Sequence, residues 1–470
     1  MIDTAKDHAL GARRRWAVLA VCSTGLFLVG LDTTIVNAAL PSIGRDLRTG
    51  VRGIAWIVDA YTLVMASLLI SAGAVADRVG RRRVFRAGLV LFGTSSMLCA
   101  AAPTLDVLLA ARIAQGAGAA MLSPVALAIV VGVFTDPAQR ARAIGVWAAV
   151  FGVAMAAGPV VGGALVQSLG WRGVFWVNLP VIAVVLVLTA LVVPESKAAR
   201  VRRLDGRGQA LLVIVVGGSV GVLLEGPRLG WASPATVVAS AVVCAAMVAF
   251  VRLEGRRSEP LIDPGLFRRA PFTAAVFSAV AVFVALGATL LVVALYLQDA
   301  RGMSPAAAGA VMLPLAVPAI VFAPLSGVLV SRHGARLPLQ LAGGFTALGG
   351  VLLFVAVGEH RPIPLLLTAL LLVGIGFGFA NPPITTTAVS GLPADRAGVA
   401  GGITSTARQF GAALGVAVAG GFIGGAAQTE LAQHARPGWV LVGCCGLLVM
   451  VAAGFAPSER GPGDRAGRIR

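Results

Sequence analysis

Long runs of apolar residues alternate with short polar connectors along almost the whole chain. About 20 consecutive apolar residues are enough for one helix to cross a lipid bilayer. Runs of about this length occupy residues 16–39, 54–76, 84–103, 105–131, 140–166, 173–193, 209–225, 234–252, 272–297, 305–330, 336–357, 363–389, 396–424 and 436–457. The pattern therefore predicts fourteen membrane-spanning segments.

Apolar and polar positions do not alternate within these runs, as they would in the strands of a membrane-spanning barrel. Backbone groups inside a bilayer have no water to bond to, so they must bond within their own segment or to a neighbouring strand. The runs are therefore expected to be helices. The predicted fold class is an all-α integral membrane protein with fourteen transmembrane helices.

Composition agrees with this interpretation, because 58% of the 470 residues are hydrophobic and only 12% are charged. An ordinary soluble domain carries about 25% charged residues. An ordinary soluble enzyme and a disordered chain are therefore both excluded.

The net charge of +18 is better explained by the orientation of the chain in the membrane than by a charged binding partner. Sorted by connector, 28 Lys and Arg residues lie on the side of the two termini and 8 on the opposite side, with Arg112 and Arg408 inside spans. Basic residues gather on the cytoplasmic side of membrane proteins. We expect a multi-pass protein of the bacterial cytoplasmic membrane, with both termini cytoplasmic and no nucleic-acid partner.

Two polar connectors, 194–208 and 253–271, are the longest inside the chain, and they bracket the spans 209–225 and 234–252. Six spans remain on each side, and the segment GAVADRVGRR after the second span aligns without gaps on GVLVSRHGAR in the later half. Two related six-helix halves with a site between them are typical of transporters. The predicted organisation is a tail at 1–15, a half at 16–193, connectors with an inserted two-helix hairpin at 194–271, a half at 272–457 and a tail at 458–470.

Several motifs follow this organisation in order. The first span ends in LDTTIVNAALP, and WRGVFWVNLP leads into the sixth span. The other motifs are the loop residues Gly73, Asp77, Arg78, Gly80, Arg81 and Arg82, then Arg112 and Gln115, the fifth-span residues Gly145, Gly158, Pro159, Gly162 and Gly163, and GVAGGITSTARQFGAALG from Gly398. Together they resemble the major facilitator superfamily, and within it the fourteen-helix drug:proton antiporters.

Asp32, Asp59 and Arg112 are charged residues inside spans, where charge is costly and usually functional. Counted from the span ends, all three lie about 8–10 Å below the outer surface at 1.5 Å per residue. Burial disfavours a charged carboxylate and a nearby guanidinium favours it, so such a group can load and release a proton. The resemblance supports proton coupling for Asp32, and the alternative is a static pair that only holds helices together. We expect proton coupling for Asp59 too, unless it reaches interfacial water, and a polarising role for Arg112 rather than a purely structural one.

The resemblance also implies roles for the loop and for the fifth span. The loop of Asp77 and Arg78 would be a conformational latch, unless its arginines only fix topology. The fifth-span motif would seal the interface between the halves, because Pro159 kinks the helix and its glycines allow close approach. Ala154 stands where the pattern has a further glycine, and ordinary packing of small residues is the alternative.

Arg408 is expected near mid-membrane, with no acidic residue of the later half at similar depth. It could meet an anionic or polyhydroxylated substrate, or donate to Asn381 and to carbonyl groups near Pro382 and Pro383. The side chains proposed to line a substrate cavity are Gln115, Trp147, Met155, Phe377, Asn381, Arg408 and Gln409.

The expected function is proton-coupled export of amphipathic small molecules such as drugs, antibiotics or secondary metabolites by alternating access. Its partners would be substrate, protons and lipid, with a monomer as the default state. We expect no enzyme activity, no metal and no cofactor, since the four histidines are scattered and no phosphate-binding loop is present. The alternatives are a facilitator or importer of the same superfamily and, less favoured, a membrane-embedded enzyme or a sensor.

Overall fold

The computed structural model describes residues 11–197, 205–257, 259–358, 362–392, 394–424 and 431–458. The predicted N-terminal tail is thus covered only from residue 11. Almost all of the predicted C-terminal tail and part of the first long connector lie outside the described residues.

Every regular element in the described part of the chain is a helix. The first half holds α1 (Ala12–Asp46), α2 (Val51–Val79), α3 (Arg81–Ala101), α4 (Leu105–Val133), α5 (Pro137–Leu169), α6 (Gly173–Trp176) and α7 (Asn178–Val192). Two helices follow, α8 (Gly206–Leu229) and α9 (Pro234–Glu254). The second half holds η1 (Pro264–Arg268), α10 (Ala270–Leu295), η2 (Tyr296–Ala300), α11 (Pro305–Val311), α12 (Leu313–His333), α13 (Arg336–Ala356), α14 (Ile363–Val389), α15 (Ala394–Ile423), α16 (Leu431–His434) and α17 (Arg436–Ala453).

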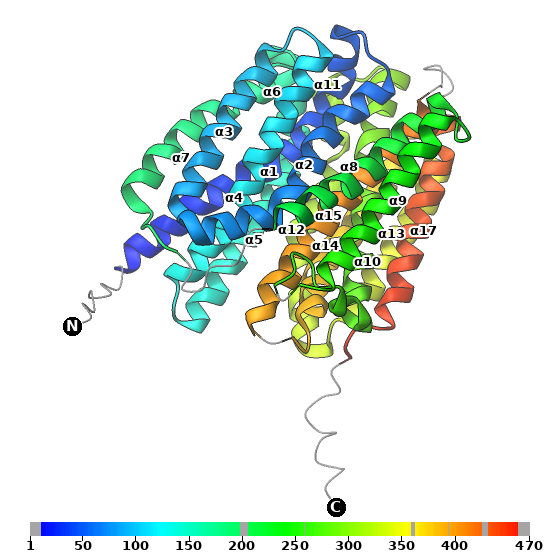
Figure 1. Ribbon diagram of the computed structural model, residues 1–470. Coiled ribbons are helices and arrows are strands. Elements are labelled where there is room, and N and C mark those ends of the chain that lie inside the picture. Colours follow the sequence, from blue (N-terminus) through cyan, green and yellow to red (C-terminus); the bar gives the residue numbers. More distant parts are fainter. Residues whose placement is uncertain are drawn as a thin grey trace, which may run out of the picture.

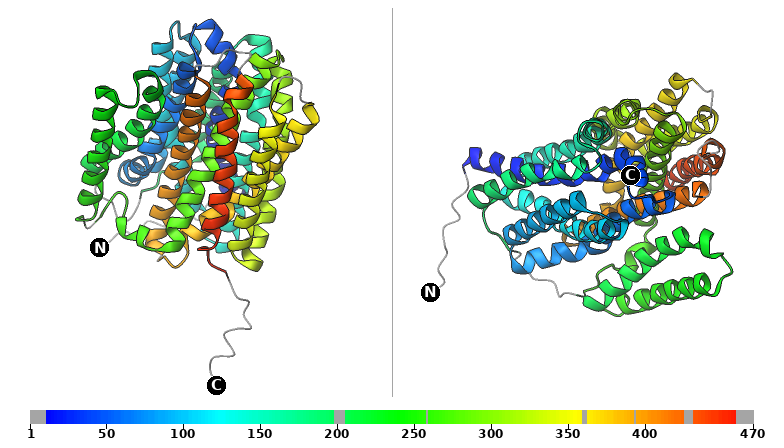
Figure 2. Two further views of the ribbon diagram at one scale, coloured as in Figure 1. Left: turned by 90° about the vertical axis from the view of Figure 1, so that its right-hand side faces the viewer. Right: turned by 90° about the horizontal axis from the view of Figure 1, so that it is seen from above.

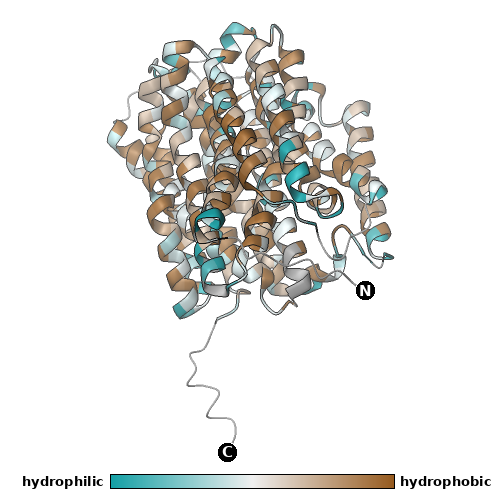
Figure 3. Cartoon of the chain, turned by 90° about the vertical axis from the view of Figure 1, so that its left-hand side faces the viewer, coloured by the Kyte–Doolittle hydropathy of each residue, from teal (hydrophilic) through white to brown (hydrophobic). Residues whose placement is uncertain are grey.

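Among the described residues, 13 helical segments are long and apolar enough to cross a membrane. The 30-residue helix α15 also runs through the bundle, between α2 and α10. The predicted all-α membrane fold is therefore confirmed, and Figure 3 shows hydrophobic residues covering most of the helix surfaces.

One expected boundary is wrong. The motif that ends at Pro41 was expected to close the first helix, but α1 continues through this proline to Asp46. Proline removes one backbone hydrogen bond, yet a packed helix can continue through it with a local adjustment. Two other expected spans are interrupted: α6 is followed by α7 after Val177, and α11 by α12 after Met312.

The two halves repeat one packing pattern. In the first half, α1 packs against α5, α2 and α3 pack against α4, and α7 covers α3. In the second half, α10 packs against α15, α12 and α13 pack against α14, and α17 covers α13. Each contact thus has a counterpart, so the chain forms two equivalent six-helix halves, which lie side by side in Figure 1.

The halves meet along two seams of equivalent construction. At the first seam, α2 packs against α15, and at the second, α5 packs against α11 and α12. We call the end of the bundle at which α1 ends the distal end, and the end at which α1 begins the proximal end (Figure 1).

The α8–α9 pair lies outside the two halves (Figure 2). α8 packs against α2 and α15, and thus over the first seam, whereas the main partner of α9 is α8. Side-chain caps define the beginnings of both helices, because Asp205 accepts from the Gly208 amide (2.8 Å) and Ser233 from the Thr236 amide (3.2 Å).

Candidate functional site

A buried ion pair lies at the centre of the first half. Nη1 of Arg112 on α4 lies 2.7 Å from Oδ2 of Asp32 on α1, and the side chains are 1% and 0% exposed. Breaking such a pair on one side would leave an uncompensated charge in a buried site. The structure therefore brings together two of the three charged residues expected to share a layer.

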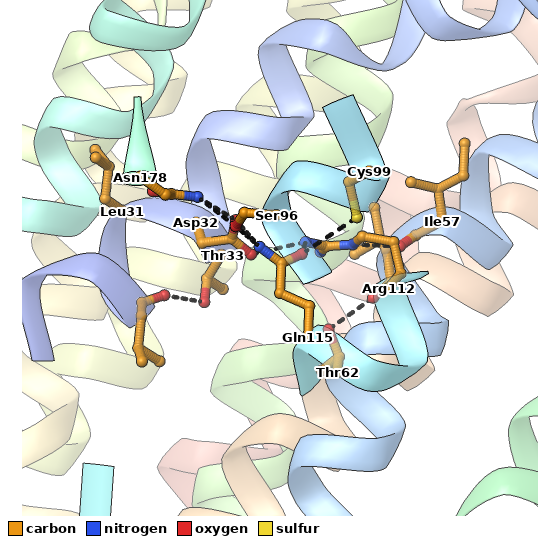
Figure 4. Close-up of polar contacts among 12 residues, drawn as sticks. Leu31, Asp32, Thr33, Ile57, Thr62, Ser96, Cys99, Arg112, Gln115 and Asn178 are labelled. Carbon is orange, nitrogen blue, oxygen red and sulfur yellow. Dashed lines mark hydrogen bonds and ion pairs between the residues drawn. The ribbon is translucent and has the colours of Figure 1, made fainter. Parts of the chain in front are cut away.

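Polar side chains from three helices surround this pair (Figure 4). Gln115 of α4 accepts from Arg112 Nη1 (2.7 Å) and donates through Nε2 to Asp32 Oδ1 (3.0 Å) and to Ser96 Oγ of α3 (2.8 Å). Asn178, at the start of α7, donates to Asp32 Oδ1 (3.4 Å) and to Ser96 Oγ (3.2 Å). The network ties together four helices of one half.

The remaining surface of the Arg112 guanidinium faces α2. Its Nε donates to the carbonyl oxygen of Ile57 (3.1 Å), and its central carbon lies 4.2 Å from the ring centroid of Tyr61. A cation over an aromatic face is stabilised by the charge distribution of the ring. Arg112 therefore has partners on α1, α2 and α4.

Sequence reasoning missed Ser96, Asn178 and Tyr61. Asn178 lies in the motif WRGVFWVNLP, so the sequence carried a signal for it, and Ser96 is a polar residue inside an apolar span. Neither feature shows which residue the side chain of Asn178 or Ser96 faces, because that depends on the rotation of α3 and α7 about their axes.

Asp59 of α2 lies apart from this network. Its side chain is 0% exposed, and neither carboxyl oxygen has a hydrogen-bond partner among the described residues. Residues four and seven positions apart share a helix face, so Asp59 lies on the same stripe as Ala55 and Ala66. Ala66 accepts a hydrogen bond from Thr406 of α15 (3.1 Å), and Ala55 packs near Gly420 of α15. Asp59 is thus buried at the first seam.

Three glycines of the fifth-span motif, Gly158, Gly162 and Gly163, lie in the distal part of α5 and face both halves. A methyl group at Gly158 or Gly162 would collide with Ile35 of α1, and one at Gly163 would collide with the backbone of Pro305 in α11. These glycines therefore let α5 approach one helix of its own half and one helix of the other.

The other members of that motif differ in their surroundings. The carbonyl oxygen of Pro159 lies against Gly309 of α11, so it belongs to the same close contact. Ala154 is buried and lies against Gly30 of α1, whereas Gly145 has no atom within 4 Å of the place where a Cβ would be. The close packing is confined to the distal part of α5.

The loop between α2 and α3 is fixed within the first half. Asp77 Oδ1 accepts from Nε (3.0 Å) and Nη2 (2.9 Å) of Arg81, which also donates to Ala128 O of α4 (3.2 Å). Arg82 donates through Nη2 to Ala190 O of α7 (3.0 Å) and through its backbone amide to Glu195 Oε1 (3.1 Å).

Glu195 is a further residue that sequence reasoning missed. Gly80 adopts φ of +127°, and a Cβ there would lie 2.7 Å from Glu195 Oε1. The Arg83 side chain lies 3.7 Å from the other carboxylate oxygen. Among the described contacts, the Arg78 side chain forms no interaction with this cluster, and Gly73 has no side chain that could form one.

The residues proposed to line a substrate cavity occupy several environments. Gln115 belongs to the Asp32 network, Met155 is buried, and Trp147 packs against the core of the first half. Phe377 of α14 packs edge-on against Phe283 of α10, with ring centroids 5.5 Å apart.

Arg408 of α15 is half buried, and its Nη2 donates to Thr385 Oγ1 of α14 (2.7 Å). Its Nε is buried and has no hydrogen-bond partner in the described part of the chain. Thr385 follows the expected partner Asn381 by one helical turn, so the long side chain reaches the next turn of the same face. Asn381 and Gln409 are also half buried.

Two equivalent helical halves, with a buried ion pair in the first half and a buried carboxyl group at the seam between them, are typical of a membrane transporter. The chain belongs to the Major Facilitator Superfamily, whose family model matches residues 22–416. This confirms the family expected from the motifs, which is a family of transporters and not of enzymes.

Named relatives agree with this assignment. The chain is 40% identical to the multidrug resistance protein Stp of Mycobacterium tuberculosis over 90% of this chain and 78% of that protein. It is 34% identical to a methylenomycin A resistance protein of Streptomyces coelicolor over 86% and 84%. The fold resembles that of a bacterial homologue of the human lysosomal transporter Spinster, solved in an inward-facing and unoccupied conformation, with a TM-score of 0.63, 17% identity, and 95% and 97% coverage.

Proposed function

We propose that this protein exports amphipathic small molecules, such as drugs, antibiotics or secondary metabolites, in exchange for protons by alternating access. One observation carries the proposal: a fully buried carboxyl group, Asp59, lies at a seam between the halves without a hydrogen-bond partner among the described residues, two residues along α2 from the carbonyl group that Arg112 contacts. The multidrug and methylenomycin A resistance of the relatives supports the substrate class.

The two carboxyl groups have different parts in this proposal. The carboxyl group of Asp32 already has partners in Arg112 and in two amide side chains. A buried carboxylate without a partner is costly, whereas the neutral form, which carries a proton, is not. Asp59 therefore carries the proton while the first seam is closed, and it releases the proton when movement of α15 admits water.

Arg112 links the two acidic residues. Its guanidinium bonds to Asp32 and also to the carbonyl oxygen of Ile57, two residues before Asp59. A displacement of α2 would alter this bond and so change the compensation of Asp32. Proton release at the seam would then be coupled to the ion pair in the first half.

The glycines of the distal part of α5 close the second seam in the conformation described, and the cluster of Asp77, Arg81 and Glu195 acts as the latch of the first half. Arg408 and Asn381, which are half buried, form a polar surface for substrate with the exposed Thr385, and Gln409 follows Arg408 in the chain.

The proton gradient supplies the energy in this proposal, without cofactor or metal. The protein would work as a monomer in the bacterial cytoplasmic membrane with both termini cytoplasmic. This orientation follows from the basic residues, which are concentrated on the side of the termini.

Transport by purified protein in sealed lipid vesicles tests the proposal. Ethidium, a quaternary cation, and a fluorescent carboxylate dye would be loaded with and without an imposed pH gradient, and internal pH would be recorded at the same time. Dye movement against its gradient, with matching proton movement, is the expected result. Movement only down the dye gradient would favour the facilitator alternative instead.

Asp59→Asn identifies the residue that carries the proton. We expect this variant to move dye down its gradient but to lose the response to the pH gradient. An undiminished response in correctly folded protein would remove Asp59 from the mechanism. Gly145→Ala, a change at an open position of α5, is the matched control.

A further inference from the structure

α8 contacts both halves of the transporter, since it packs against α2 of the first half and α15 of the second. Its chain connectors also lead to both halves. If the halves move relative to one another, α8 can stay with only one of them, and its contacts indicate which.

The distal part of α8 is held to α2 by Glu225. Its carboxylate accepts from Arg52 Nη1 at 2.9 Å and from the indole Nε1 of Trp56 at 3.0 Å. Glu225 is 30% exposed, so the ion pair is partly screened, but the indole bond fixes the direction of the carboxylate. Gly221, one turn earlier, packs against the ring of Trp56.

The proximal part of α8 is held to α2 by Gln209. Its Nε2 donates to the carbonyl oxygen of Ser67 (2.8 Å), and its Oε1 accepts from the hydroxyl of Ser71. The centres of the two attachments lie roughly 23 Å apart along α2 at 1.5 Å per residue. Two such separated attachments oppose both sliding and tilting of α8 on α2.

The contact between α8 and α15 has a different character. A Cβ at Gly421 of α15 would lie 3.7 Å from Pro227 Cγ and 3.9 Å from the Leu223 carbonyl oxygen, which is ordinary packing distance. Among the described residues, no hydrogen bond or ion pair joins these two helices. Small apolar surfaces of this kind allow close contact without fixing the register.

We propose that the α8–α9 hairpin is a brace of the first half, in which Glu225 and Gln209 are positioning residues that fix α8 to α2 while α15 slides past it. The two attachments lie on either side of the part of α2 that carries Asp59 and the Ile57 carbonyl bonded to Arg112, so α8 moves together with that part. This inference rests on the alternating access proposed above.

Disulfide tethers in the full-length protein test which contact moves. The five native cysteines would first be replaced by serine, at positions 22, 99, 244, 444 and 445. Ser71→Cys with Gln209→Cys joins α8 to α2, and Pro227→Cys with Gly421→Cys joins α8 to α15. Trp56→Cys with Gly221→Cys is a second α2 tether, in case the first fails to fold.

The readout is independent of substrate. Ala308 of α11 is 1% exposed at the distal end of the second seam, so a cysteine there becomes accessible only when this end opens. The rate at which a membrane-impermeant maleimide modifies this cysteine would be compared before oxidation forms the tether, after oxidation, and after reduction breaks the tether.

The α2 tether should leave the rate of maleimide modification within about twofold of the untethered value. The α15 tether should lower this rate about tenfold, and reduction should restore it, because the tether traps one conformation. A block by the α2 tether, or free opening with the α15 tether, would overturn the brace. Absence of modification in the untethered protein would instead contradict alternating access itself, and the brace with it.

Discussion

Asp32 and Arg112 form a buried ion pair whose every described partner belongs to the first half. The Nη1–Oδ2 distance is 2.7 Å, and Gln115 bonds to both side chains. A pair held in this way on several sides is rigid in the conformation described. It compensates charge within one half, whereas the carboxyl of Asp59 lies at a seam between two halves.

Removal of one partner of the pair should destabilise the fold strongly. Arg112→Ala leaves Asp32 buried without compensation, and we expect a loss of about 3–5 kcal/mol in unfolding free energy. Chemical denaturation in mild detergent, followed by tryptophan fluorescence, would measure it. The double variant Asp32→Asn, Arg112→Ala should lose less than the sum of the losses in Asp32→Asn and Arg112→Ala alone. Strict additivity would contradict coupling between the two residues.

Asp59→Asn should behave in the opposite way. In the proposed mechanism the carboxyl group of Asp59 is neutral in this conformation, so its replacement by an amide should change the unfolding free energy by less than about 1 kcal/mol. The difference between Asp59→Asn and Asp32→Asn, measured in the same detergent, separates a proton-carrying acid from a charged one. Equal destabilisation by the two changes would show that Asp59 has a compensating partner.

The sequence predicted the helices and the layer of Asp32 and Arg112 because the physical signals are local. Apolar runs of the length of a bilayer and the cost of intramembrane charge need no knowledge of tertiary contacts. The same reasoning failed at Pro41, where packing lets the helix continue.

Contacts between distant segments could not be predicted in this way. Glu225 and Glu195 are charged residues near helix ends, where solvation is an adequate explanation from sequence alone. Their partners, Trp56 and Arg82, become visible only when α8 and the segment after α7 are placed against α2 and α3. Asp59 was recognised as an intramembrane acid, but its position at the seam depends on the rotation of α2.

Gly163→Ala should weaken closure of the distal end. The added methyl group would meet the backbone of Pro305, which cannot move without displacing α11, and overpacking of this kind costs about 1–3 kcal/mol. The added methyl group would destabilise the conformation described by this amount relative to a conformation with an open distal end. A cysteine at position 308 should therefore react faster with maleimide. Gly145→Ala, which meets no atom within 4 Å, should leave the rate unchanged.

Gly80→Ala tests the cluster between α2 and α3. The residue adopts φ of +127°, and its Cβ would also press on Glu195, so we expect a loss of about 1–3 kcal/mol in unfolding free energy. Gly170 has φ of +73° but no atom within 4 Å, so Gly170→Ala reports backbone strain alone. If both variants lost the same stability, the contact with Glu195 would have no role.

Arg408 can be assigned to substrate binding or to structure by comparing two changes. Its Nη2 donates to Thr385 Oγ1, and among the described residues its Nε has no hydrogen-bond partner. The side chain is half buried. If Arg408 binds substrate, Arg408→Lys should keep the fold but raise the KM for a carboxylate dye about tenfold or more, because a bidentate contact is lost. The KM for ethidium should change little. Thr385→Val removes the internal bond and should lower KM for the carboxylate dye or leave it unchanged, since the guanidinium is then free for substrate. Equal losses of folding yield in both variants, with KM unchanged, would assign Arg408 to the packing of α14 and α15.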